Sequence, residues 1–262
     1  MNILFAILLS AIQIMSYNIR VGNAPDGDND WSIRRPASVQ MILDQKPDIV
    51  GLQEALEFQV KYLQDNCKGY EAIGVGRDNG GTKGEHMTIF YKKSRLKCLG
   101  WGTFWLSETP DKPSKGWDGA YPRTATWAMM LDKKTGKVFF AVNTHLDHVG
   151  YEAREKGLAL IEEMLAAINP NGYPVTLTGD FNCTVDFPAL KGIRSKMCNS
   201  RETAVQGDDT KSFNNWGKGG DNIDFIWYSG FSGCSRFSTI TKTYGNIPYV
   251  SDHYPVSAVL EY

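Results

Sequence analysis

Short apolar runs of strand length alternate with longer amphipathic segments along most of this chain. A run that is apolar throughout predicts a strand buried in a sheet, whereas apolar residues at helical spacing predict a helix with one buried face. These patterns predict helices at residues 30–43, 58–63 and 152–168, and strands at residues 15–20, 49–53, 70–75, 87–91, 96–101, 124–131, 138–144, 175–178, 223–227, 237–243 and 256–260. The two halves repeat the same order of strands and helices, which predicts two sheets packed face to face with helices outside.

Turn-forming residues separate these elements. Lys46-Pro47-Asp48 ends the first helix, and Asn169-Pro170-Asn171-Gly172 ends the third. The turn Lys133-Lys134-Thr135-Gly136 predicts that the strands on either side of it form a hairpin. Because no low-complexity linker divides the chain, we expect a single domain over residues 12–262.

Residues 1–11 have two interpretations. They contain the apolar core of a secretory signal peptide, but they lack a positively charged start and a clear small-residue cleavage site. Alternatively, they are an N-terminal extension that leads into a buried first strand ending near Asn18. The sequence therefore leaves open whether the protein is exported or cytoplasmic.

Composition narrows the classes of function. A hydrophobic fraction of 42% supports a sizeable core, and a net charge of −1 excludes the broad cationic surface that binds a long duplex. No apolar stretch reaches the roughly 20 residues that cross a bilayer. The five cysteines are scattered without a CxxC pair, so we expect mostly buried free thiols rather than a disulfide framework or a zinc cluster.

Polar side chains recur at the ends of the apolar runs. They are Asn18, Glu54, His145, Asp180 with Asn182, and Asp224. Each has an ordinary explanation when taken alone: Glu54 suits a charge near a helix N-terminus, a Gly-Asp-x-Asn segment suits a turn, and a single histidine suits the core. Five separate runs that end this way indicate a built site, because a carboxylate is a poor residue for a strand end that has no use for it.

These residue types together favour phosphoester hydrolysis. Asp180 and Asn182 are two positions apart on a segment expected to be extended, so their side chains should point the same way. Carboxylate and amide oxygens suit a hard cation such as Mg²⁺ or Mn²⁺. Asp252 and His253 are adjacent, and Asp224 can accept the ring N–H of His253 and make the imidazole a base toward water. A metal ion, an activated water and donors around a tetrahedral anion describe this chemistry.

The order of the motifs carries a family resemblance from about Ile14 to the C-terminus. The motifs are SYNIR, LQEA, GEHMTIFYKK, PRTATW, NTHLDHVG, TGDFN, NIDFIW and SDHYPV. Together they resemble the endonuclease/exonuclease/phosphatase superfamily, which includes pancreatic deoxyribonuclease, abasic-site endonucleases, deadenylases, neutral sphingomyelinases and inositol-polyphosphate 5-phosphatases. The closest motifs are those of deadenylase-like and uncharacterised bacterial members. The resemblance implies an α/β fold, a four-layered α/β sandwich of two packed mixed sheets flanked by helices.

The resemblance also implies metal-side residues. Glu54 resembles the family's metal-binding glutamate, and Asn18 resembles the asparagine that positions that carboxylate and the metal. Asp252 resembles the second carboxylate on the metal side. Asp180 and Asn182 resemble the pair that orients the attacking water and contacts the phosphate.

Further residues follow from the same resemblance. His253 resembles the catalytic histidine, and Asp224 resembles the aspartate that orients it. His145 resembles the phosphate-contacting histidine, and Glu85 resembles its carboxylate partner in part of the family. Arg123 matches an arginine near the phosphate in several branches. Abasic-site endonucleases have a tyrosine at the position of His145, which argues against that branch.

The implied reaction is one in-line displacement by water with Mg²⁺ or Mn²⁺ as cofactor and no covalent enzyme intermediate. We expect a monomeric phosphodiesterase or nuclease that acts on a phosphoester substrate such as a nucleotide or single-stranded nucleic acid. An inositol-phosphate phosphatase, a sphingomyelinase-type phospholipase and a non-catalytic binding protein remain alternatives. The aromatic segment at residues 101–122 suits stacking of a base or sugar, or simply covers the sheet. The glycine-rich loop at residues 80–84, with Arg77, Lys92 and Lys93 nearby, suits contact with a phosphate or a solvated rim, and we expect the rim.

Overall fold

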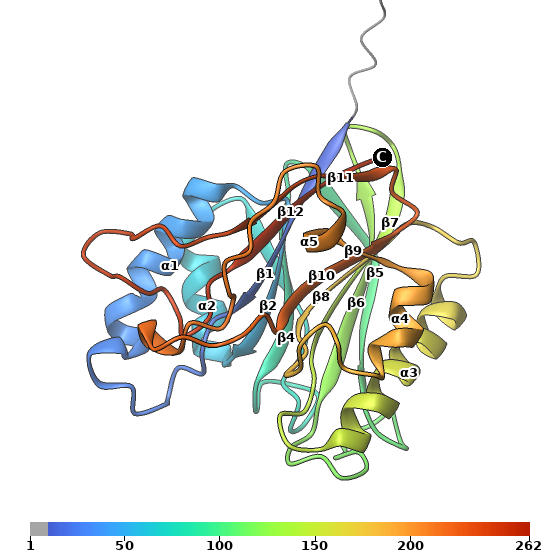
Figure 1. Cartoon of the computed structure of the whole chain (residues 1–262), viewed down its shortest axis with the longest axis horizontal. Helices are drawn as coiled ribbons and strands as arrows, with labels where there is room; N and C mark the ends of the chain where they lie inside the picture. Colours follow the sequence, from blue (N-terminus) through green and yellow to red (C-terminus); the bar gives the residue numbers. More distant parts are fainter. Residues whose placement is uncertain (1–9) are drawn as a thin grey trace, which may run out of the picture.

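Two six-stranded sheets pack against each other, and the helices lie around them (Figure 1). The computed structural model describes residues 10–262. The first sheet has the order β11 (Gly233–Thr239), β12 (Val256–Glu261), β1 (Ala11–Asn18), β2 (Ile49–Ala55), β4 (His86–Lys92), β3 (Tyr70–Ile73). The second has the order β5 (Leu96–Trp105), β6 (Thr124–Asp132), β7 (Val138–His145), β8 (Val175–Asp180), β10 (Asp224–Ser229), β9 (Cys198–Asn199). The predicted sandwich of two mixed sheets is confirmed.

The longer helices begin and end where the turn residues predict. They are α1 (Trp31–Gln45), α2 (Glu57–Asn66) and α3 (Tyr151–Ile168). The side chain of Asp30 accepts a hydrogen bond from the Ser32 N–H and so caps α1, and Lys46 ends the helix in a left-handed conformation. The predicted hairpin is confirmed, because β6 and β7 pair antiparallel around the lysine-rich turn.

Several predicted boundaries were wrong. The strand expected at residues 237–243 begins earlier and ends at Thr239, and β5 continues to Trp105. Two short helices, α4 (Leu190–Lys196) and α5 (Ser200–Thr203), were not predicted. Both are too short to show a helical repeat of apolar residues in the sequence.

Three apolar clusters give the sandwich its layers. Ile12 and Ile14 of β1 pack between the sheets with Phe139 and Ile226 of the second sheet. Residues of the same strand with the opposite orientation, such as Tyr17, pack with α1 and α2. A third cluster lies between the second sheet and α3. Central strands are buried on both faces, which is why they appear as continuous apolar runs in the sequence.

A polar seam joins the two sheets near one end of the sandwich. Gln53 Nε2 donates to Asn143 Oδ1 at 2.7 Å, and Thr178 Oγ1 donates to the same oxygen at 3.0 Å. Gly51 permits this approach, since a Cβ there would lie 2.1 Å from Thr178 Oγ1. The seam is buried and fixes how the sheets meet beside the predicted site residues.

The strand directions bring the predicted site residues to one end of the sandwich. β1 runs parallel to β2, and β7 runs parallel to β8, so the C-terminal ends of these four strands carry Asn18, Glu54, His145 and Asp180. β10 is antiparallel to β8, which places Asp224, at its start, opposite Asp180. β12 is antiparallel to β1, so the Ser-Asp-His segment that precedes it arrives at the same end.

The remaining sequence expectations have mixed outcomes. Residues 1–9, which hold most of the proposed signal segment, lie outside the described residues. Among residues 10–262, no helix has the length and apolar character needed to span a membrane. All five cysteines are free, but only Cys67 and Cys234 are buried and Cys198 is exposed, so the expectation of mostly buried thiols was wrong.

Candidate active site

The strand ends enclose a cavity of about 810 Å³. Eight of the ten residues predicted from the sequence line it: Glu54, Glu85, Arg123, His145, Asp180, Asn182, Asp252 and His253. The other two, Asn18 and Asp224, are buried and hold lining residues in place. The structure therefore brings all ten together at one end of the sandwich.

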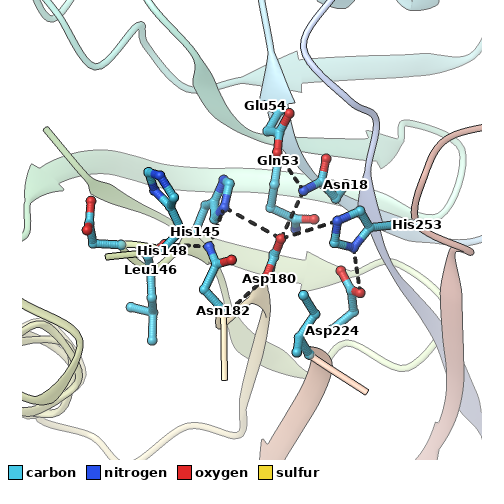
Figure 2. Close-up of polar contacts among 12 residues, drawn as sticks. Asn18, Gln53, Glu54, His145, Leu146, His148, Asp180, Asn182, Asp224 and His253 are labelled. Atoms are coloured by element: carbon cyan, nitrogen blue, oxygen red, sulfur yellow. Dashed lines mark hydrogen bonds and ion pairs between the residues drawn. The ribbon is translucent and has the colours of Figure 1, made fainter. Parts of the chain in front are cut away.

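Asp180 lies at the centre of this group, between two histidines (Figure 2). Its Oδ2 is 3.5 Å from His145 Nε2 and 3.7 Å from His253 Nε2. Oδ2 also accepts from Asn18 Nδ2 at 3.0 Å, and Oδ1 accepts from the Asn182 N–H at 2.9 Å. Burial raises the pKa of Asp180 to about 7, against the opposing effect of His253. The carboxyl group can therefore exchange a proton near neutral pH.

Glu54 sits on an irregularity at the end of β2. The register with β4 shifts between Leu52 and Ala55, and Glu54 has a φ of 61°, in the left-handed region that disfavours non-glycine residues. A bulge of this kind redirects a side chain, and here it directs the carboxylate to the cavity. Glu54 Oε1 accepts from Asn18 Nδ2 at 3.0 Å, and Oε2 accepts from the Val21 N–H at 2.9 Å. Strained backbone is retained where it serves a site.

Asn182 corrects the prediction of an extended segment. β8 ends at Asp180, and Asn182 has a φ of 49°, so the chain turns instead of continuing. The turn still brings Asn182 to the cavity, because Nδ2 donates to the Leu146 carbonyl and to His145 Nε2, both at 2.9 Å. The spacing of Asp180 and Asn182 correctly predicted that the two side chains lie together, but the extended backbone expected between them was wrong.

The contact with Asn182 fixes the tautomer of His145. Nε2 of His145 accepts the amide N–H, so the ring proton lies on Nδ1, which has no hydrogen-bond partner among the described residues. Burial, reinforced by the guanidiniums of Arg123 and Arg77, holds the pKa of His145 well below its usual value. His145 is therefore a neutral imidazole.

Glu85, the proposed partner of His145, is engaged mainly with an arginine. Its Oε2 accepts from Arg77 Nη1 at 2.7 Å and lies 4.0 Å from His145 Nδ1. Burial raises the pKa of Glu85 although Arg77 opposes the shift. The carboxylate thus faces both groups, and its hydrogen bond is to Arg77.

His253 is held between two carboxylates. Its Nδ1 donates to Asp224 Oδ2 at 2.8 Å, as the sequence predicted, and its Nε2 faces Asp180. Burial acts to lower the pKa of His253, but Asp224 and Asp180 outweigh it and raise the pKa to about 10. Phe213 lies against the ring, with centroids 4.9 Å apart. At neutral pH His253 is an imidazolium.

Asp252 lines the cavity next to Arg20. Its Oδ2 lies 3.8 Å from Arg20 Nη1, and Ser251 Oγ donates to Oδ1 at 3.1 Å. Arg20 is also bonded to Asp26, which raises the pKa of the guanidinium. Like Glu54, Arg20 has a positive φ, 61°. Both Glu54 and the residue beside Asp252 therefore have a left-handed backbone conformation.

Three further lining residues were not among the ten predicted site residues: Arg77, Tyr121 and His148. The loop at residues 80–84 is largely exposed, as expected, but Arg77 beside it is 8% exposed and forms part of the cavity wall. Tyr121 comes from the aromatic segment, and His148 follows His145 in the NTHLDHVG motif. His148 is the second histidine of that motif, but nothing in the sequence indicated that its ring faces the cavity.

The residues present fit a divalent metal ion. Glu54, His145 and Asp180 each offer one ligand atom, and these atoms lie within 4.8 Å of one another. Asp180, Asp224 and His253 lie equally close together, but the charged His253 ring already lies between those two carboxylates and offers no nitrogen to a metal ion. The predominance of carboxylate oxygen is the donor set that Mg²⁺ or Mn²⁺ prefers.

Comparison with known proteins decides the family. A model of the endonuclease/exonuclease/phosphatase family matches residues 15–253. The chain belongs to this family. Its members are typically metal-dependent hydrolases of phosphoester bonds.

Two solved structures are similar to nearly the whole chain, and one further relative is similar to part of it. A mannosyl-6-phosphatase of Bacteroides thetaiotaomicron is 34% identical, with a TM-score of 0.92, over 96% of this chain and 100% of that chain. A family protein of Bacteroides vulgatus is 37% identical, with a TM-score of 0.90, over 96% and 99%. An uncharacterised protein of Acanthamoeba polyphaga mimivirus is 28% identical over 160 residues, 58% of this chain and 59% of the length of that relative.

Proposed function

We propose that this protein is a metal-dependent phosphomonoesterase that removes the phosphoryl group from a phosphorylated sugar. The observation that carries the proposal is the buried carboxylate of Asp180 between His145 and His253, in a cavity of about 810 Å³. That volume is typical of small-molecule sites. The similarity to a mannosyl-6-phosphatase supports a sugar monoester.

The phosphodiesterase or nuclease predicted from the sequence is the alternative, since both reactions use the same centre. The net charge of −1 and the absence of a long basic run in the sequence disfavour a long polynucleotide. A small substrate that enters the cavity needs no such surface. We therefore favour a phosphate monoester over a diester as the substrate.

A metal ion would be held on the Glu54 side of the cavity, with Asp252 as a second carboxylate. When bound, Mg²⁺ or Mn²⁺ supplies Lewis-acid polarisation of the phosphoryl group and stabilisation of the leaving oxygen. Asn18 holds the Glu54 carboxylate in place by donating to Oε1. Asn18 Oδ1 itself accepts from the Arg20 N–H at 3.0 Å. In this arrangement Asn18 orients a ligand rather than offering a free oxygen.

Asp180 is assigned as the group that accepts the proton of the attacking water. His253 already carries its proton, because it lies between Asp224 and Asp180, and an imidazolium cannot act as a base. The N–H of His253 instead stabilises the negative charge that grows on the phosphoryl oxygens. On the other side of Asp180, the Nδ1–H of His145 is a neutral donor, and Asn182 holds that ring in place by donating to Nε2.

The test compares hydrolysis of p-nitrophenyl phosphate and hexose 6-phosphates with that of bis-p-nitrophenyl phosphate and a single-stranded oligonucleotide. Each assay is run with EDTA, Mg²⁺ or Mn²⁺ on the wild type, Glu54→Ala and the control Glu57→Ala, which alters a half-exposed carboxylate on α2. Monoester hydrolysis that needs metal and is lost only in Glu54→Ala is the expected result.

Two other outcomes would replace this proposal. Hydrolysis confined to the diesters would make the protein a phosphodiesterase with the same metal site. Metal binding without hydrolysis of any phosphoester would favour the non-catalytic binding protein.

A further inference from the structure

One wall of the cavity is built from four side chains in mutual contact. Tyr121 stacks on His148, with ring centroids 5.8 Å apart and planes at 16°. The Arg77 guanidinium lies 5.2 Å from the centre of the Tyr121 ring. Arg123 Nη2 lies 3.1 Å from His148 Nδ1. All four residues line the cavity, so the cluster is part of the surface that a substrate meets.

A buried carboxylate fixes this wall in place. Asp147 is 1% exposed, and its Oδ2 accepts from Arg123 Nε and from the Tyr121 N–H, both at 3.3 Å. Its Oδ1 accepts from the N–H groups of Val149 at 3.0 Å and Gly150 at 2.9 Å. One side chain therefore ties the loop before β6 to the loop after β7, and Arg123 and His148 are held at a defined distance.

The contact with Arg123 decides which nitrogen of His148 carries the proton. A guanidinium has donors and no acceptor, so Nδ1 of His148 must accept. In the neutral ring the proton then lies on Nε2. His148 is itself exposed, so this N–H is free to meet a ligand in the cavity.

The position of the cluster separates it from the group that is transferred. The Glu54, His145 and Asp180 ligand atoms lie together at the centre, whereas His148 is linked to Arg123 and Tyr121 and has no hydrogen bond to those three. Figure 2 draws the His148 ring beyond His145, on the side away from His253. A donor in this place suits contact with the leaving group of an ester rather than with its phosphoryl group.

The charges of the wall favour a neutral polar partner. Arg77 is paired with Glu85 at 2.7 Å, and Arg123 is paired with Asp147 at 3.3 Å. Each guanidinium is thus offset by a carboxylate, and a second phosphate would find little net positive charge. The hydroxyl groups of a sugar need only hydrogen-bond donors and acceptors.

We propose that His148 is a specificity-determining residue, whose Nε2–H donates a hydrogen bond to a hydroxyl oxygen of the sugar leaving group. The inference rests on the proposed sugar phosphatase activity and assigns the part of the cavity that recognises the sugar. Tyr121 and Arg123 position the imidazole, and Asp147 positions both. Such a contact stabilises the bound substrate and the transition state equally, so its loss raises KM more than it lowers kcat.

The experiment compares a hexose 6-phosphate with p-nitrophenyl phosphate, which has no hydroxyl on its leaving group. His148→Phe keeps a ring for stacking on Tyr121 but has no donor, and His148→Gln restores an N–H near the position of Nε2. We expect His148→Phe to lower the ratio of kcat/KM for the sugar to kcat/KM for the aryl ester about tenfold, mainly through KM, because one hydrogen bond is lost. His148→Gln should recover much of the ratio.

Val149→Ala is the matched control, because Val149 is 63% exposed in the same loop. It should keep the wild-type ratio. The tautomer has an independent readout, since a long-range ¹H–¹⁵N correlation spectrum distinguishes the two ring nitrogens, and the protein has only four histidines. We expect His148 to be the Nε2–H tautomer.

Three results would overturn the inference while leaving the phosphatase intact. They are a loss of the same factor on both substrates in His148→Phe, no loss on either substrate in that variant, and a dominant Nδ1–H tautomer. Failure of the phosphatase itself is visible in the wild type, as hydrolysis of diesters only, and it would remove the sugar subsite as well.

Discussion

Asp224 and Asp180 lie directly opposite each other across the antiparallel pair of β10 and β8, and their carboxylates share one histidine. Asp224 binds Nδ1 of His253 at 2.8 Å, and Asp180 lies 3.7 Å from Nε2. Two like charges on neighbouring strands would repel, and the imidazolium between them offsets that repulsion. The strand register places the two carboxylates, and the segment that precedes β12 brings His253 between them.

Asp224→Asn tests this arrangement. The backbone pairing with β8 is unchanged, but the amide cannot hold the imidazolium, so the pKa of His253 should fall from its raised value of about 10. We expect hydrolysis to fall about 10²-fold or more, as for other losses of an acid–base partner. Steady-state kinetics and NMR titration of His253 provide the measurement. Asp221→Asn, at an exposed position nearby, is the control. Activity within twofold of wild type would rule out the role of Asp224.

A second prediction is that hydrolysis requires a metal ion and that Asn18 maintains the affinity for that ion by holding Glu54. EDTA should abolish hydrolysis, and Mg²⁺ or Mn²⁺ should restore it. Asn18→Ala removes the donor to Glu54 Oε1 and Asp180 Oδ2, so we expect metal affinity to fall by about 10–100-fold, the usual effect of losing an outer-shell partner. Calorimetric titration with each metal measures this, with the exposed Asn66→Ala as control. Unchanged affinity in Asn18→Ala would place the metal elsewhere.

The left-handed conformation of Glu54 makes a third prediction, about stability. Glu54→Ala and Glu54→Gly both remove the carboxylate, so both should lose activity. Glycine accepts a φ of 61° without steric cost, whereas alanine does not. We expect Glu54→Gly to be more stable than Glu54→Ala by about 1 kcal/mol. Urea unfolding of the two variants gives the difference, and a more stable alanine variant would contradict the strained backbone.

Asp147 makes the fourth prediction, a dependence of stability on pH. Burial acts to raise the pKa of Asp147, but hydrogen bonds from the Gly150, Ala120 and Val149 N–H groups, with the Arg123 charge, outweigh it and hold the pKa below its usual value. A depressed folded-state pKa contributes stability above the unfolded value of about 3.9, and this is lost as the pH falls toward the folded value.

The stability difference between the wild type and Asp147→Asn should therefore be largest near neutral pH. We expect about 1–3 kcal/mol there, from the loss of hydrogen bonds to a charged acceptor, and a smaller difference below about pH 4. Urea unfolding at several pH values measures it, and Asp111→Asn, at an exposed position, is the control. A difference that grows toward acid pH would have the wrong sign.

The sequence by itself predicted the sheet sandwich and most of the residues that meet in the candidate site. Continuous apolar runs predict strands buried on both faces, and polar residues at their ends identify Asn18, Glu54, His145 and Asp180, because few other uses exist for such groups at a strand end. The family motifs added the remaining members. These features are local or follow from the order of the motifs, so no tertiary information was needed.

Only the tertiary structure decided the turn at Asn182, the pairing of Glu85 with Arg77 and the position of His148. Two of these depend on distant parts of the chain, Leu146 for Asn182 and Arg123 for His148, and the third depends on how the loop before β4 folds Arg77 back onto Glu85. Hydrophobic patterns in a sequence predict which face of a single helix or strand is buried. The direction of a polar side chain at a strand end is set by its hydrogen-bond partners across the two sheets.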